Sequence, residues 1–86
     1  MNRDSLDIYR KTITLNTRIN AIAKDTSATA AERKEKIAAI VSEAQKEHII
    51  SNKTKDTYFK AIQTLSEGKG ITSELTRAMQ GAEGKA

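Results

Sequence analysis

The sequence predicts an all-α fold, a small bundle of three main helices followed by a short C-terminal helix. Proline is absent from the 86 residues and the four glycines stand at positions 68, 70, 81 and 84, so the first 67 residues lack the two strongest helix breakers. Apolar residues recur at helical spacing through this stretch. The short chain suits one domain, which we expect over residues 1–80, with a flexible tail over residues 81–86.

The first helix is expected over residues 4–24, with Asp4 or Ser5 as its N-cap. Its apolar residues form one broad face made of two adjoining arcs. They are Ile8, Leu15, Ile19 and Ile22 on the first arc, and Leu6, Tyr9 and Ile13 on the second. The alternating, β-branched run over residues 12–15 leaves a strand open as an alternative at that point.

The second helix has the clearest start, because the sequence Thr-Ala-Ala-Glu from Thr29 to Glu32 has the form of a capping box. Its apolar pattern continues to His48. Residues 25–28 offer no apolar anchor, so we expect a short turn there, with the first two helices as antiparallel neighbours.

The two C-terminal helices are predicted from capping residues and glycines. Ser51 or Asn52 can cap a third helix, which we expect to continue until the glycines at positions 68 and 70 stop it. Thr72 or Ser73 can open the short fourth helix, which we expect to end at Gly81.

The composition excludes several kinds of site. With no Cys, the chain has no disulfide, no thiolate metal site and no Cys nucleophile, and a single His is far from the usual four-ligand zinc set. No cofactor or metal is therefore expected. No apolar run approaches the ~20 residues that cross a bilayer, and the N-terminus lacks the pattern of a signal peptide, so we expect a cytoplasmic protein without membrane contact.

No enzyme is expected, because the sequence shows no nucleophile with a base and an orienting partner, and no glycine-rich phosphate loop. As a general base, His48 would need an orienting neighbour such as Glu43 or Glu47. Its position at the end of an apolar stripe favours instead a half-buried residue near a helix C-terminus, where a cation is stabilised.

Two groups of basic residues are candidate contacts for a partner or a nucleic acid. The first helix carries no acid between Ile8 and Lys24, and its cations project away from the apolar face, where phosphates could bind. The second group surrounds the start of the third helix. The candidate residues are Arg10, Lys11, Arg18 and Lys24 on the first helix, and Lys53, Lys55 and Lys60 on the third.

The sequence favours a non-enzymatic interaction protein, namely a small regulator, inhibitor or assembly factor that binds a protein partner through a helix face. A core of about sixteen large aliphatic and aromatic residues is thin, so we also expect a homodimer. The alternative is a nucleic-acid-binding accessory factor that uses the basic residues above. It ranks second, because the net charge of +4 is mild and is shared equally by the two halves of the chain.

Overall fold

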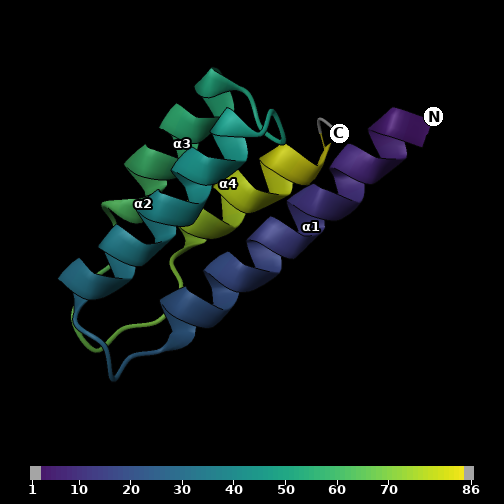
Figure 1. Ribbon diagram of the computed structural model, residues 1–86. Coiled ribbons are helices and arrows are strands. Elements are labelled where there is room, and N and C mark those ends of the chain that lie inside the picture. Colours follow the sequence, from purple (N-terminus) through teal and green to yellow (C-terminus); the bar gives the residue numbers. More distant parts are fainter. Residues whose placement is uncertain (1–2, 85–86) are drawn as a thin grey trace.

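The computed structural model describes residues 3–84, and these residues form four helices and no strand. The helices are α1 (Arg3–Lys24), α2 (Ala30–Lys46), α3 (Asn52–Ile62) and α4 (Ser73–Gly84). They form an up-down-up-down bundle, in which α1 and α3 each contact α2 and α4 and lie diagonally to one another (Figure 1). The all-α prediction is confirmed, as is the antiparallel pairing of the first two helices.

The core lies along the axis of the bundle and receives fully buried side chains from every helix. These are Ile19 from α1, Ile37 and Val41 from α2, Tyr58 from α3 and Leu75 from α4. Burial of one such aliphatic side chain contributes about 1.5–3 kcal/mol to folding. The thin core is therefore shared by all four helices, and no pair of them is a separate unit.

The first helix is the longest, with 22 residues, and its N-terminal turns extend beyond the other helices (Figure 1). It begins at Arg3, before the two residues that the sequence offers as N-caps. Its apolar face is only partly buried, because its first turns extend beyond the other helices and Ile13 lies on the side of α1 opposite the buried Leu15. Leu6, Ile8 and Ile13 remain 41%, 38% and 36% exposed.

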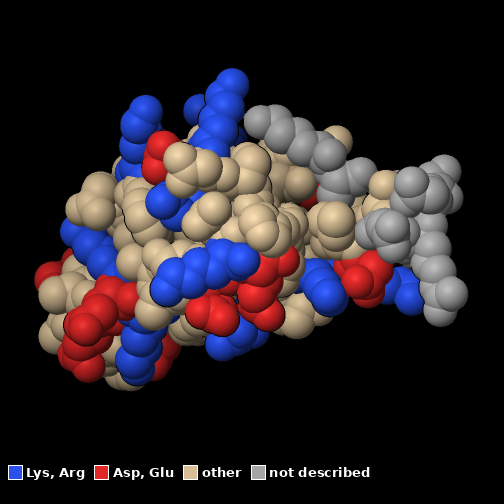
Figure 2. Space-filling view, turned by 45° about the horizontal axis from the view of Figure 1, so that its top comes forward, with Lys and Arg blue, Asp and Glu red and all other residues tan. Residues whose placement is uncertain are grey.

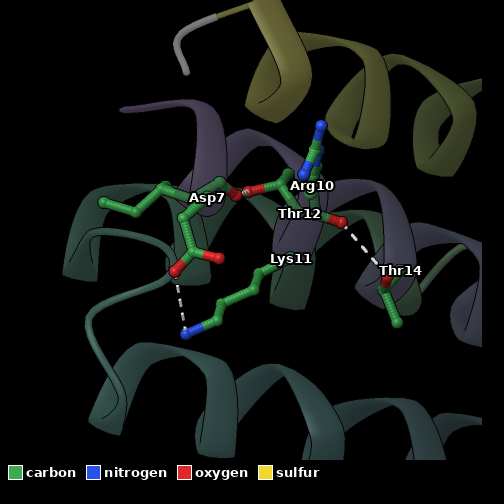
Figure 3. Close-up of polar contacts among 6 residues, drawn as sticks. Asp7, Arg10, Lys11, Thr12 and Thr14 are labelled. Atoms are coloured by element: carbon green, nitrogen blue, oxygen red, sulfur yellow. Dashed lines mark hydrogen bonds and ion pairs between the residues drawn. The ribbon is translucent and has the colours of Figure 1, made fainter. Parts of the chain in front are cut away.

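The β-branched run in α1 is helical, so the strand alternative is wrong. The Thr12 hydroxyl donates to the Ile8 carbonyl at 2.8 Å, and the Thr14 hydroxyl donates to the Arg10 carbonyl at 3.1 Å (Figure 3). Threonine hydroxyls that bond four residues back satisfy themselves inside the helix. The backbone of the run is hydrogen-bonded within α1 as well, so the run needs no sheet partner.

The capping box at the start of α2 is confirmed. The Thr29 hydroxyl accepts from the Glu32 N–H at 3.1 Å, and the Glu32 carboxylate accepts from the Thr29 N–H at 3.3 Å and from its hydroxyl at 2.9 Å. These hydrogen bonds hold the pKa of Glu32 below its usual value. The Glu67 carboxylate, from the turn before α4, also accepts from the Ala30 N–H at 2.9 Å.

The end of α2 differs from the expectation. The helix ends at Lys46, and His48 is exposed with a left-handed φ of 62°. The His48 N–H donates to the Gln45 carbonyl at 3.0 Å, and the Ile49 N–H donates to the Ala44 carbonyl at 2.9 Å. This is the Schellman pattern, in which glycine usually holds the position of His48.

The third helix ends at Ile62, so the expected stop at Gly68 is wrong. Tight three-residue bonds replace the helical ones, because the Thr64 N–H and hydroxyl both donate to the Ala61 carbonyl and the Leu65 N–H donates to the Ile62 carbonyl. Leu65 still packs in the core, from this turn. In the sequence, the spacing of Leu65 from the apolar residues of α3 is therefore the same as if the helix continued for one more turn.

The fourth helix starts as expected, since the Thr72 hydroxyl accepts from the Leu75 N–H at 3.3 Å. It continues past Gly81 to Gly84, so the expected helix end at Gly81 is wrong. Ala82 is buried against the core, and Glu83 is hydrogen-bonded to α1, so packing holds this last turn in place. Residues 85 and 86 of the expected tail lie outside the described residues.

Candidate functional site

A groove of about 370 Å³ lies between α1 and α2, and we call it the α1/α2 groove. Its floor is apolar and consists of Leu15 from α1, Ile40 and Ala44 from α2, and Ile49 from the Schellman turn. Thr14 and Ala39, both exposed, also line the groove. The volume lies within the range of natural binding pockets, about 300–1,000 Å³.

The two walls of the groove carry opposite charges. Lys11 and Arg18, two helical turns apart, line it from α1. Glu43 from α2 and Glu47, the C-cap of that helix, lie one turn apart and line the other side. All four side chains are exposed, and among residues 3–84 neither glutamate nor Arg18 takes part in an ion pair. The basic wall therefore stands opposite an acidic wall without being neutralised by it.

Lys11 has one charged neighbour within its own helix. Its Nζ lies 3.2 Å from the Asp7 Oδ2, and both side chains are more than half exposed (Figure 3). An exposed pair of this kind contributes about 0.3–0.5 kcal/mol and opens readily. Figure 3 also shows Lys11 extending on the side of α2, whereas Arg10 points away from it.

The structure divides the basic residues proposed from the sequence. Lys11 and Arg18 meet in the α1/α2 groove, but Arg10 does not line it and Lys24 is exposed in the last turn of α1. Lys53, Lys55 and Lys60 belong to α3, which is diagonal to α1. Of these, Lys55 has its Nζ 5.6 Å from the centre of the Phe59 ring, where a cation is attracted by the aromatic face. The seven residues therefore do not form one patch.

Acidic residues are mixed with these cations over the surface. Figure 2 shows Lys and Arg side chains interspersed with Asp and Glu on the face in view. Such a mixture is typical of an ordinary solvated surface, and it weakens the field that a polyanion would meet.

The acidic wall was not predicted from the sequence. Glu43 and Glu47 were considered there only as neighbours of His48, yet they lie at i and i+4, on one side of the end of α2 and its C-cap. The available signal was the antiparallel pairing of the first two helices, which brings the late part of α2 beside the early part of α1. Combining that pairing with the charges would have predicted the opposed walls.

A polar cluster also lies inside the bundle, away from the α1/α2 groove. The Tyr58 hydroxyl donates to the Asn16 Oδ1 at 2.7 Å, and the Asn16 amide donates to the Met79 carbonyl at 3.1 Å and to the Glu83 carboxylate at 2.8 Å. Burial raises the pKa of Tyr58, and the neighbouring Glu83 raises it further. Because Asn16 and Tyr58 are buried, the cluster joins three helices rather than offering groups to a substrate.

Arg33 is the second polar group that the sequence did not reveal. It has no exposed surface. Its guanidinium donates to the Ala23 carbonyl at 2.9 Å, and to the Ser66 and Lys69 carbonyls at 2.7 Å each. Its Nε has no hydrogen-bond partner. Arg33 therefore ties the end of α1 to the turn before α4.

The remaining chemistry of the described residues is sparse. Among the side chains that the structure describes, no three His, Asp or Glu residues gather as a metal site would require. Within the same residues, no helix combines the length and the apolar character needed to span a bilayer. No protein-family model, curated protein or solved structure matches the chain.

Proposed function

We propose that the chain is a non-enzymatic interaction protein, a small cytoplasmic regulator, inhibitor or assembly factor that binds a protein partner through a helix face. The observation that supports this function is the α1/α2 groove, with its apolar floor and charged walls. Grooves between two helices are a recurrent site for a helix of another protein. The floor provides the apolar area for affinity, and the charges at the rim provide selectivity.

Self-association is a second part of the proposal. Leu6, Tyr9 and Ile13 follow one another at helical spacing on the N-terminal turns of α1, and we call them the α1 stripe. Leu6 and Ile13 are exposed and Tyr9 is half-buried, although all three are large apolar side chains. An exposed row of this kind is typical of a contact surface, and we propose that it joins two copies in a homodimer.

Nucleic-acid binding remains the runner-up function. It would use the cations of α1 and α3, but these lie on diagonal helices and are mixed with acids. A duplex would also meet Glu43 and Glu47 beside Lys11 and Arg18. The scattered cations and the neighbouring acids are the reasons for placing nucleic-acid binding after protein binding.

The test is affinity capture from cells that express the chain naturally, with and without nuclease. We expect the wild type to retain a protein partner after nuclease treatment. Ala39→Trp should lose that partner, because Ala39 is exposed and a large ring there would fill the α1/α2 groove without disturbing the core. Ala31→Trp is the matched control, since Ala31 is exposed on the same helix and lies outside the groove.

Two results would overturn the proposed function. Capture that persists unchanged in Ala39→Trp would show that the groove is not the binding site. Capture that disappears after nuclease treatment would favour the nucleic-acid function instead.

A further inference from the structure

The charges on the walls of the α1/α2 groove restrict what can occupy it. An acidic surface would be attracted to Lys11 and Arg18 but repelled by Glu43 and Glu47, and a basic surface would meet the reverse. The occupant that satisfies both walls carries the two signs separately, on opposite sides of an apolar centre. An amphipathic helix has this form, since its apolar stripe separates two polar flanks.

The dimensions of the groove agree with a helix. Its α1 wall runs from Lys11 to Arg18, seven residues, which is about 10 Å along the axis. This length accommodates two turns of a partner helix, with apolar side chains at i and i+4 or i+7 seated on Leu15, Ile40 and Ile49.

A second copy of the chain does not fit this role. The α1 stripe is the apolar row that a second copy would have to insert into the groove. At 100° per residue, however, Ile13 of the stripe lies about 200° around α1 from Lys11 in the groove. Stripe and groove therefore face opposite sides of one helix. Insertion of one copy's stripe into the next copy's groove would generate an open series rather than a closed pair.

We propose that the α1/α2 groove binds an amphipathic helix of another protein, with acidic residues on the flank beside Lys11 and Arg18 and basic residues on the flank beside Glu43 and Glu47. This inference rests on the proposed function and adds the chemistry of the partner. It also assigns the helix a direction, because turning the helix end for end exchanges its flanks.

The test uses three synthetic helical peptides of about 14 residues, four turns, with the same apolar stripe. One has an acidic and a basic flank, one has two acidic flanks and one has two basic flanks. We expect the wild type to bind the mixed peptide about three- to tenfold more tightly than either of the others at low salt, measured by fluorescence anisotropy. A peptide with merely exchanged flanks is no control, since it binds in the reverse direction.

Reversing the walls should change the order of the peptides. Lys11→Glu/Arg18→Glu makes both walls acidic, so this variant should prefer the peptide with two basic flanks. The further changes Glu43→Lys/Glu47→Lys restore opposite walls, and the fourfold variant should again prefer the mixed peptide. All four side chains are exposed, and circular dichroism would check that each variant keeps its helices.

The matched control is Lys53→Glu/Lys60→Glu. These two lysines are exposed on α3 and have the same seven-residue spacing, so the change in net charge is identical but lies away from the groove. We expect this variant to keep the wild-type order of the peptides. Ala39→Trp should weaken the binding of the mixed peptide.

The inference would be overturned if wall reversal left the order unchanged, if the control shifted it equally, or if no peptide bound the wild type. These outcomes are independent of the capture experiment. If the capture experiment still finds a nuclease-resistant partner that Ala39→Trp loses, the proposed function stands. Only the chemistry proposed for the partner helix is then withdrawn.

Discussion

At the scale of single residues, Arg33 has the most unusual surroundings in the bundle. It is a fully buried cation that is held by backbone carbonyls and by no carboxylate. A planar guanidinium holds five N–H donors in a rigid fork spread over three nitrogens, whereas an ammonium has three donors on a single nitrogen. One side chain can therefore join the end of α1 to two points of the turn before α4.

We expect Arg33→Ala to lower the free energy of unfolding by about 3 kcal/mol or more, because it removes a buried side chain and leaves the Ala23 carbonyl without this donor. Arg33→Lys should fall between the wild type and Arg33→Ala. Lys36→Ala, an exposed change on the same helix, should stay within about 0.5 kcal/mol. Urea unfolding measures all three, and a wild-type stability for Arg33→Ala would contradict the role given to Arg33.

Nothing in the sequence distinguishes Arg33 from the half-buried Lys34 and the exposed Lys36 beside it. Its burial depends on a turn more than thirty residues later, whose carbonyls need a donor. Asn16 is similar, because its partners come from α3 and α4. The burial of such polar residues depends on contacts between helices. The residue pattern within one helix carries no information about those contacts.

At the scale of helices, the starts were predicted better than the ends. Thr29 and Ser51 cap their helices with their own hydroxyls, and the capping chemistry is complete within four residues. The ends of α3 and α4 depend on packing instead. Leu65 is buried although it lies in the turn after α3, and Ala82 is buried because α4 continues for one more turn. The spacing of apolar residues alone therefore predicts both helix ends at the wrong position.

The end of α2 provides a prediction at this scale. His48 takes a left-handed conformation that costs an L-residue about 1–2 kcal/mol and costs glycine little. After the greater entropy of glycine in the unfolded chain is subtracted, we expect His48→Gly to stabilise the protein by about 0.5–1 kcal/mol. For a domain of this size, that corresponds to an increase in Tm of about 2–8 °C.

His48→Ala is the control for this prediction. It removes the imidazole but keeps a Cβ in the left-handed conformation, so its Tm should stay near that of the wild type. A lower Tm for His48→Gly would mean that the imidazole, rather than the backbone, matters at this position.

At the scale of the whole molecule, the sequence predicted the helical class and the pairing of α1 with α2, because breakers, caps and periodicity are local. It also identified Lys11 and Arg18, but it grouped them with cations that the bundle places elsewhere. The α1/α2 groove depends on the relative positions of two helices and on Ile49 in the Schellman turn. Those positions are set by packing, which explains why the acidic wall was missed.

The N-terminal turns of α1 extend past the bundle, and this shape is the basis of the last prediction (Figure 1). We expect the chain to be a dimer by light scattering at micromolar concentration, held by the α1 stripe. Leu6→Asp/Ile13→Asp should weaken the dimer about tenfold or more and keep the helical circular dichroism, since both side chains are exposed in one copy. Ile19→Asp should instead unfold the protein, because Ile19 is fully buried in the core. A wild type that remains monomeric at these concentrations, or a Leu6→Asp/Ile13→Asp variant that dimerises equally well, would remove the stripe as an interface.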